Sequence, residues 1–420
     1  MRRTISFVLL ILICQFTFGQ KTIEVTISNP AKSAREAQPV VLVLKQYADF
    51  PVRSALVTLN GQEIPCQLDD LNADGTYDEL CFLTDISKKG QRTFRVELLS
   101  TGEPRSYEPK VYADMMLTNK KIKSSNKQDL YISSLTVDNG TNPYWMLHHH
   151  GPAFENEMVA YRIYFDHRQT VDTYGKYRKG LELKQTQFYP DDEQKAAGFG
   201  DDVLWVGSTF GCGALRGWDG EQPQMLTDVN HRTLRILSRG PLRTVVEVID
   251  EGWNAPLAKH QTPNATPQSR ITMHTLYKLY AGRRDVQVDI RFCPSAKGYQ
   301  FATGVINVKN SEEYSDHQGL RGCWGTDWPV SAKDSVGHKR ETVGLGICIP
   351  RKYVVEELPA NKDNYPFVVS TDSQELNYHI TFGSDNESFG FHSAKAWFEY
   401  LQAWKRELEQ PLLISVKDIK

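Results

Sequence analysis

Titratable side chains are dense between His148 and Lys176, where the sequence reads HHHGPAFENEMVAYRIYFDHRQTVDTYGK. Alternation along residues 158–165 places Arg162 and Tyr164 on one face of a predicted strand. After a turn at 167–169, a second strand-like run places Tyr174 and Lys176 on one face. If the two strands form a hairpin whose polar faces coincide, these cations and phenols line one sheet surface. Such a surface can bind a polar substrate and transfer its protons.

Imidazoles and carboxylates precede the first of these strands. The histidines at 148–150 stand before a glycine, and Glu155 and Glu157 follow at the strand entrance. Their combination predicts a functional cluster in which His149, Glu155 and Glu157 contact a substrate. The alternative is structural: Glu155, Glu157 and Arg162 form a salt-bridged network that braces the sheet, and two of the histidines are exposed.

Two glycine-rich segments, GFGDDVLWVGSTFGCGALRGWDG and RGCWGTDWP, carry tryptophans. Glycine allows a loop to approach a ligand closely, and an indole ring can stack on a sugar face. Trp205 and Trp324 are therefore candidate substrate contacts. The alternatives are an ordinary edge loop for the first segment and a place in the core for either aromatic ring.

The segment DLNADGTYDEL resembles a compact calcium loop, with Asp70, Asn72, Asp74 and Asp78 as oxygen ligands and Gly75 at the tight turn. The carboxylate expected at position twelve of an EF-hand is missing, because Cys81 stands there. The alternative is an Asx-rich hairpin turn without metal. In both cases the role is structural.

The chain begins MRRTISFVLLILICQFTFGQ, which has the charged start, the short apolar run and the small residues of a secretory signal peptide over 1–20. We therefore expect a periplasmic or secreted protein, and no later segment is apolar enough to span a membrane. The 49 basic and 51 acidic residues nearly balance, so charge gives no reason to expect a nucleic-acid partner. Cys66 and Cys81 could form a disulfide across a hairpin, although isolated buried thiols are the default.

Short strands separated by turn signals run through the whole chain, which predicts an all-β fold. The charged, proline-marked segment EPRSYEPK divides an N-terminal β-sandwich over 21–108 from a larger β domain over 109–420. The exception is SAKAWFEYLQAWKRELEQP, whose apolar residues recur at helical spacing between a capping Ser393 and Pro411. This C-terminal amphipathic helix should pack its aromatic stripe on a sheet.

Several chemistries lack their sequence signatures. The chain contains no GxSxG elbow, P-loop, HExxH or dinucleotide-binding fingerprint, and its cysteines have no zinc-ligand spacing. Acyl transfer, phosphoryl transfer, nicotinamide chemistry and a zinc site are therefore not predicted.

The segment HGPAFENEMVAYRIYFDHRQTVDTYGK, the leader and the DLNADGTYDEL loop together resemble a secreted bacterial family that is known as a domain of unknown function and occurs in polysaccharide utilisation loci. The resemblance covers most of the mature chain. It implies a galactose-mutarotase-like β-supersandwich over 109–420 and an oligosaccharide or polysaccharide substrate. It further implies elimination or dehydration of uronate-containing sugars, as in uronic-acid lyases and a dehydratase of unsaturated ulvan oligosaccharides. Such chemistry requires no cofactor, so calcium would be structural.

Under that implication, the cluster supplies the three groups that elimination beside a uronate needs. Arg162 would neutralise the carboxylate, His150 would take the carbon-bound proton, and Lys176 would add electrostatic support. Tyr161 or Tyr174 would protonate the leaving oxygen, although alternation puts Tyr161 opposite Arg162 and so favours Tyr164 and Tyr174. The alternatives are a glycoside hydrolase that uses Glu155 and Glu157, a mutarotase-like enzyme and a non-catalytic carbohydrate-binding protein.

Overall fold

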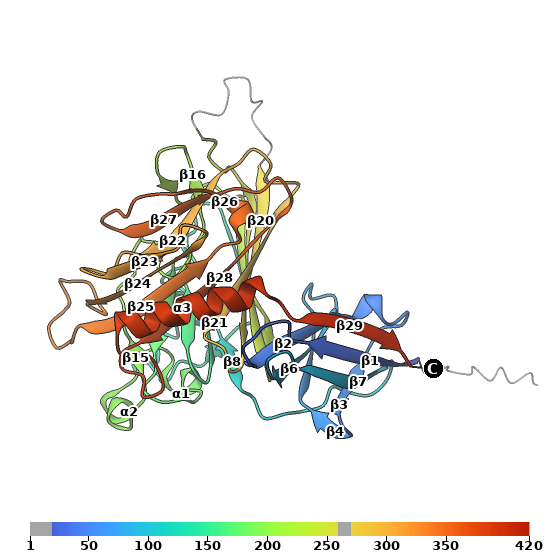
Figure 1. The fold of residues 1–420 in the computed structure, drawn as a ribbon. Helices are drawn as coiled ribbons and strands as arrows, with labels where there is room; N and C mark the ends of the chain where they lie inside the picture. Colours follow the sequence, from blue (N-terminus) through green and yellow to red (C-terminus); the bar gives the residue numbers. More distant parts are fainter. Residues whose placement is uncertain (1–18, 259–269, 420) are drawn as a thin grey trace, which may run out of the picture.

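The computed structural model describes residues 19–258 and 270–419. Figure 1 shows two bodies built of sheets: a small one that contains the N-terminal strands and a larger one that contains most of the chain. The predicted all-β fold with a C-terminal helix is confirmed. The predicted signal peptide lies outside the described residues except for its last two positions. Within the described ranges, no helix is both long and apolar enough to cross a membrane.

The small body is a sandwich of a five-stranded and a three-stranded antiparallel sheet within the described ranges. Their apolar residues alternate with exposed ones, so that Ile23, Val25 and Ile27 are fully buried between the sheets. The five-stranded sheet has the order β29-β1-β7-β3-β4, and the other has the order β2-β6-β5. The elements are β1 (Gln20–Ser28), β2 (Arg35–Val43), η1 (Leu44–Gln46), β3 (Ser54–Leu59), β4 (Gln62–Ile64), β5 (Cys66–Asp69), β6 (Glu79–Ile86), β7 (Gln91–Leu99) and β29 (Leu413–Asp418).

The C-terminal strand β29 belongs to this small body, although it is the last strand of the chain. It pairs with β1 in antiparallel register, with Val416 opposite Val25, and Figure 1 shows the two strands side by side. The larger domain predicted over 109–420 therefore gives its last strand to the N-terminal sandwich.

The larger body packs a nine-stranded sheet against two five-stranded sheets, counted within the described ranges. Their facing side chains form the main hydrophobic core. The nine-stranded sheet contains β11 (Ser134–Asp138), β18 (His231–Arg239), β19 (Arg243–Trp253), β20 (Ile271–Tyr280), β21 (Asp285–Cys293), β28 (Glu375–Ser384), β25 (Glu341–Cys348), β24 (Leu320–Asp327) and β23 (Glu312–Ser315), in that order.

The two smaller sheets cover the same face of the large one. The first contains β15 (Asp201–Asp202), β14 (Val171–Gly175), β13 (Ala160–Ile163), β12 (Ala153–Asn156) and β8 (Val111–Asp114), in that order. The second contains β17 (Pro223–Gln224), β16 (Arg216–Trp218), β22 (Phe301–Ile306), β27 (Asn364–Val369) and β26 (Val354–Glu357). The remaining described elements of this body are the short pair β9 (Met116–Leu117) and β10 (Leu130–Tyr131), the turns η2 (His148–His150) and η3 (Arg351–Tyr353), and the short helices α1 (Leu183–Thr186) and α2 (Asp192–Ala196).

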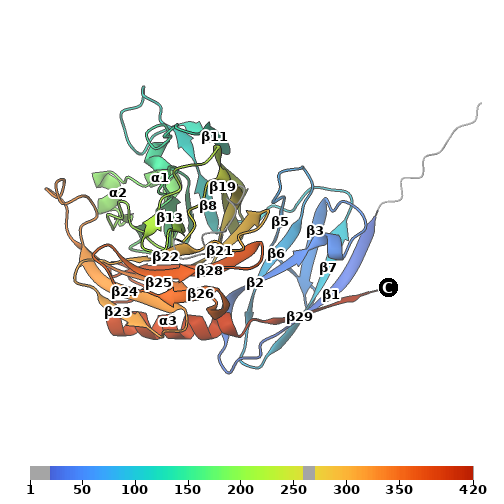
Figure 2. The same cartoon turned by 90° about the horizontal axis from the view of Figure 1, so that it is seen from above.

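The predicted helix is α3 (Ala394–Glu409), and the Ser393 side chain accepts a hydrogen bond from the Ala396 amide as expected of a cap. Its aromatic stripe packs on the outer face of the nine-stranded sheet, where Trp397 is fully buried. Figure 2 shows α3 on one side of this sheet and α1, α2 and β13 on the other.

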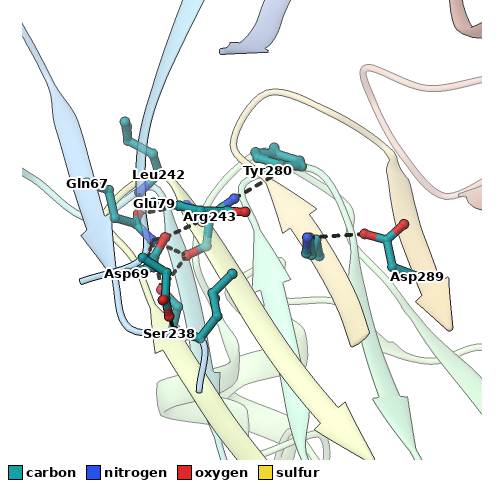
Figure 3. A network of polar contacts seen from close by, with 11 residues as sticks. Gln67, Asp69, Glu79, Ser238, Leu242, Arg243, Tyr280 and Asp289 are labelled. Atoms are coloured by element: carbon teal, nitrogen blue, oxygen red, sulfur yellow. Dashed lines mark hydrogen bonds and ion pairs between the residues drawn. The ribbon is translucent and has the colours of Figure 1, made fainter. Parts of the chain in front are cut away.

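The two bodies meet at a buried guanidinium in β19 (Figure 3). Arg243 has no exposed side-chain surface, and its nitrogens bind Asp69 and Glu79 of the small body at 2.7 Å each. Gln67 completes the contact, because its amide oxygen accepts from the backbone N–H groups of Leu242 and Arg243 at 2.6 and 3.0 Å. A buried cation between two carboxylates fixes the relative position of the two bodies.

The cysteines of the described residues are free thiols. Cys66 lies opposite Phe82 across β5 and β6, while Cys81 lies opposite Gln67. The two cysteines are therefore one position out of register and are not bonded, so the default alternative is confirmed.

Arg243→Ala should lower the free energy of unfolding by about 3–5 kcal/mol, because it leaves Asp69 and Glu79 without a cation at the interface. The measurement is urea denaturation followed by tryptophan fluorescence. Arg105→Ala is the matched control, since it removes an exposed pair with Glu63 and should cost no more than about 1 kcal/mol. Equal midpoint urea concentrations for the two variants would contradict the proposed contribution of the Arg243 contact to stability.

Candidate functional site

The hairpin of β13 and β14 carries the centre of the site. In its register Arg162 lies opposite Asp172 and Ala160 lies opposite Tyr174, so the two polar faces coincide as predicted. Tyr161 points to the opposite face, where its hydroxyl donates to the carbonyl oxygen of Arg284 at 2.8 Å. The period of two along each strand is therefore sufficient to place Arg162 and Tyr164 together.

Arg162 is buried and surrounded by acceptors. Its Nη2 lies 2.6 Å from Asp172 and 2.9 Å from Asp202, and its Nη1 donates to the Tyr189 hydroxyl at 3.0 Å. The family resemblance implied that this guanidinium binds a substrate carboxylate, but two carboxylates of the protein already hold it. Its position supports a role in orienting its neighbours.

Those neighbours are Tyr164 and Asp202. The Tyr164 hydroxyl donates to Asp172 Oδ2 at 2.8 Å, and burial together with Asp172 raises its pKa well above the ordinary value. Asp202 reaches the surface, with 19 % of its side chain exposed. Burial and the nearby Asp172 raise its pKa well above the usual range of a carboxyl group. Tyr164 therefore keeps its proton near neutral pH, and the raised pKa of Asp202 makes this carboxyl group easier to protonate than an ordinary aspartate.

The remaining polar residues of the hairpin brace it. Lys176 has no exposed side-chain surface and donates to Glu155 at 2.5 Å and to the carbonyls of Asn156 and Gly180. Glu155 is equally buried and accepts from the backbone N–H groups of Glu182 and Leu183. The predicted network of Glu155, Glu157 and Arg162 is wrong, because Glu155 pairs with Lys176 and Arg162 pairs with Asp172 and Asp202. None of the histidines at 148–150 is exposed, as that alternative also required of two of them. Glu155 has no exposed side-chain surface with which to contact a substrate, whereas electrostatic support by Lys176 stays a prediction.

Tyr174 and Glu157 also lie apart from Tyr164. The Tyr174 hydroxyl is buried and donates to the carbonyl of Gly200 at 2.7 Å and to Glu182 at 3.1 Å. Glu157 is half-buried in the turn between β12 and β13, where one of its oxygens has no partner in the described structure. Tyr174 therefore shares the sheet face of Arg162, but its hydroxyl is bound elsewhere, and Glu157 stands in the turn away from that face.

The three histidines form the turn η2, whose backbone is strained at His149 and His150, with φ of 42° and 69°. The turn packs tightly on β13, because a Cβ on Gly151 would lie 1.8 Å from the carbonyl oxygen of Ile163. This close approach directs His150 toward the outer end of the hairpin. His149 turns inward instead and lies 3.3 Å from Asp114, with 1 % of its surface exposed.

His150 stacks on the ring of Tyr144, with centroids 3.8 Å apart and planes within 6°. Its Nδ1 lies 3.0 Å from the Tyr144 carbonyl oxygen. A carbonyl oxygen only accepts, so Nδ1 carries the proton and Nε2 keeps a free lone pair. Burial lowers the pKa of His150 to about 4, which keeps the ring neutral at ordinary pH.

Arg168 and Tyr144 join the site without having been predicted. The Arg168 guanidinium lies over the rings of Tyr144 and Tyr164, at 4.5 and 5.0 Å from their centroids, and Asp166 binds it at 2.7 Å. Arg168 stands in the turn of the hairpin, where no periodicity assigns a face, and Tyr144 lies outside any predicted strand. The FDHR sequence was the one signal for Arg168, because an acidic residue two positions before an arginine can form a local ion pair that orients its side chain.

Of the predicted tryptophans, Trp205 is 49 % exposed and Trp324 is 8 % exposed. Trp324 packs against Trp397 of α3, at 6.3 Å between centroids, and so belongs to the core beneath that helix. An unpredicted indole, Trp145, is 76 % exposed and meets His150 edge-on at 5.1 Å. It is the most exposed aromatic ring that contacts the predicted base.

In the predicted calcium loop, the side-chain oxygens bind the loop itself. Asp70 and Asn72 accept hydrogen bonds from the Asp74 amide, Asp70 also binds Gly75, and Asp78 binds Leu71. Among the described residues, no three His, Cys, Asp or Glu side chains are grouped to hold a metal ion. The contacts are those of Asx turns, and calcium binding by Asp70, Asn72, Asp74 and Asp78 stays a prediction.

The model of a family described as "Domain of unknown function (DUF4861)" matches residues 27–414 of the chain. No curated protein matches the sequence. Among solved structures, the chain is similar to a protein in the glycosyl hydrolase family 38 from Enterococcus faecalis, at 11 % identity and a TM-score of 0.46. It is also similar to an alpha-mannosidase from Enterococcus faecalis V583, at 12 % identity and a TM-score of 0.43. Both matches cover 94 % of this chain but only 47 % and 46 % of the respective structures, so the chain spans about half their length.

Arg162→Ala should destabilise the fold by about 3–5 kcal/mol, because Asp172 and Asp202 would be left buried without their cation. This differs from the result expected if Arg162 only bound the substrate carboxylate, in which case the variant would lose activity and keep its fold. The effect is measured by thermal unfolding of the two variants Arg162→Ala and Arg178→Ala. Arg178→Ala is the control, because it removes an exposed arginine next to the same hairpin. Two variants of equal stability would show that Arg162 does not hold the carboxylates in place.

Proposed function

The chain belongs to the DUF4861 family, a domain of unknown function, and we propose that it is a secreted enzyme that eliminates or dehydrates uronate-containing oligosaccharides. The observation that carries the proposal is the pairing of a neutral imidazole, His150, with a protonated phenol, Tyr164, whose rings lie 6.1 Å apart. Elimination beside a carboxylate needs one group that takes a carbon-bound proton and one that gives a proton to the departing oxygen. The secretion leader predicted from residues 1–20 supports the cellular location.

His150 is the proposed base. Its Nδ1 is bound to the Tyr144 carbonyl, so the lone pair of Nε2 is the one available to a substrate. The stacked Tyr144 ring and the strained turn hold the imidazole in one orientation. Proton abstraction would convert this ring to an imidazolium, which returns the proton to solvent after turnover.

Tyr164 is the proposed acid. Its hydroxyl is held by Asp172 at 2.8 Å and lies 3.4 Å from Arg162 Nη2. The guanidinium stabilises the phenolate that forms when the proton passes to the leaving oxygen. A proton from solvent then restores the phenol, so that the two residues together return to their starting states.

Arg168 is the proposed partner of the substrate carboxylate. Tyr164 is only 2 % exposed, and Arg168 lies over its ring. Asp166 is the one carboxylate that binds Arg168 among the described residues, whereas Arg162 is held by two. A uronate that draws Arg168 away from Asp166 would neutralise its own charge and uncover the phenol in the same movement.

Exposed aromatic rings support a sugar as the substrate. Trp145 contacts His150 directly, and Trp205 follows Asp202 closely in the chain, with about half of its surface exposed. Indole rings bind the apolar faces of sugars. The two tryptophans therefore supply binding surface close to groups that can move protons.

A glycoside hydrolase is the second candidate, because Asp172 and Asp202 bind the same nitrogen of Arg162 and burial raises the pKa of Asp202. Glycosidases use a pair of neighbouring carboxyl groups, of which the general acid has a raised pKa. Asp172, however, has no exposed side-chain surface, which disfavours it as a nucleophile. Hydrolysis would add water without forming a double bond, whereas a lyase would produce an absorbing enoate and a dehydratase would lose one water from an intact oligosaccharide.

Tyr164→Phe should lower kcat by about 10²- to 10⁴-fold on uronate-containing oligosaccharides, because it removes the proposed acid. Ultraviolet absorbance and product mass measure the reaction. The matched control is Tyr112→Phe, which removes a hydroxyl bound in the same way to an aspartate two residues away, Asp114, at 2.9 Å. Full activity in Tyr164→Phe, or equal loss in both variants, would overturn the assignment.

The pH profile tests His150. A base must be neutral to act, so activity is present above its pKa and is lost as the pH falls through that value. Because burial lowers the pKa of His150 to about 4, the acid limb of kcat/KM should lie near pH 4. An acid limb near the ordinary imidazole value of about 6.5 would contradict the role. His150→Ala should remove both the activity and this limb.

A further inference from the structure

A cleft of about 1030 Å³ lies where the small body meets α3 and the turn between β20 and β21. One wall is the 30–36 segment that precedes and begins β2. The opposite wall is the C-terminal half of α3, and residues 282–285 form the floor. Its size is that of a ligand-binding site rather than a packing defect.

Cations dominate the lining of this cleft. Six of the lining side chains are basic and three are acidic, the basic ones being Lys32, Arg35, Lys89, Arg283, Arg284 and Arg406. Lys32 and Arg406 are exposed, and no carboxylate of the described residues lies within ion-pair distance of either. An anion that enters the cleft therefore finds positive charge without an internal partner.

The carboxylates of the cleft are mostly compensated. Arg283 binds both Asp285 and Glu407, at 2.8 and 2.7 Å, and Glu36 is exposed at the outer edge. Glu387 binds Arg284 from behind the lining, and the six cations still exceed these three carboxylates and Glu387 together. The field inside the cleft is therefore positive.

Two buried arginines of the lining are also incompletely satisfied. Arg284 binds Glu387 through Nη2, whereas its Nη1 has no hydrogen-bond partner among the described residues. Arg35 is 3 % exposed and its Nε likewise has none. Buried donors without partners are costly, and a nearby anion would lower that cost.

Aromatic rings complete the wall. Tyr400 and Trp404 line the cleft from successive turns of α3, with centroids 6.4 Å apart and planes within 11°. A flat apolar surface beside an excess of guanidinium and ammonium groups is suited to a sugar ring that carries an anionic substituent.

The cleft is separate from the polar cluster around Tyr164. The part of the β12–β13 hairpin that lines it is Met158, and Tyr164 lies six residues farther along the chain. At the rise of a β-strand this separation is on the order of 20 Å. A ligand in the cleft therefore does not occupy the proposed active site.

We propose that this interdomain cleft is a second binding site, which takes an acidic sugar residue with its carboxylate or sulfate among Lys32, Arg284 and Arg406 and its ring against Tyr400. The site would hold one part of an acidic glycan at the junction of the two bodies. Its chemistry follows from the cleft alone and does not depend on the reaction at His150 and Tyr164.

The test is calorimetric titration of the full mature protein with a short oligogalacturonate, and with a neutral oligogalactan of equal length. The double variant Lys32→Glu/Arg406→Glu should weaken binding of the acidic ligand by at least about tenfold, since two attractions become repulsions. Lys362→Glu/Lys395→Glu is the matched control, because it changes the net charge equally at exposed lysines outside the cleft. Its affinity should stay within about twofold of the unaltered protein.

Equal affinities in the two double variants would overturn the proposal, as would equal binding of the neutral oligogalactan. Both altered pairs consist of exposed side chains, so thermal melts should match that of the unaltered protein. Product formation is followed in the same samples. Failure of the proposed function would appear as no product from the unaltered protein, whereas failure of the cleft proposal would appear as unchanged binding in Lys32→Glu/Arg406→Glu.

Discussion

The contact between Arg162 and the paired carboxylates Asp172 and Asp202 is the interaction on which the candidate site depends. A buried guanidinium is tolerated only where acceptors surround it. These acceptors come from β14, which pairs with β13, and from β15, the next strand of the same sheet. Asp172 in turn holds the Tyr164 hydroxyl. The charge of Arg162 therefore fixes the position of the Tyr164 phenol. Because the two carboxylates occupy the guanidinium, Arg162 itself does not contact a substrate.

The same constraint recurs at two other buried cations of the described residues. Lys176 is enclosed by Glu155 and two carbonyls, which closes the inner end of the hairpin. Arg243 lies between Asp69 and Glu79 and joins the two bodies, as Figure 3 shows. The cleft beside α3 is the exception, because its cations exceed its carboxylates. Positive charge that no carboxylate of the protein neutralises can attract an anionic ligand.

Backbone strain and ring stacking give the adjacent histidines different roles, so that His149 is structural and His150 is available for chemistry. The positive φ angles of η2 send His149 toward Asp114 and His150 toward Tyr144. Only His150 then combines partial exposure with a neutral ring and a defined tautomer. Its neighbour Trp145 is exposed, so the proposed base lies beside the surface on which a sugar would bind.

The sequence by itself determined the features that repeat over short distances. The period of two placed Arg162 and Tyr164 on one face, and helical spacing between Ser393 and Pro411 gave α3, because backbone geometry imposes these periods locally. Tertiary structure decided what depends on distant segments. It paired β29 with β1, brought Asp202 and Tyr144 to the hairpin, and buried Trp324 beneath Trp397. It also gave Glu155 and Arg162 their counter-charges. Local periodicity carries no information about which strands become neighbours, and the exposure and charge balance of a side chain follow from those neighbours.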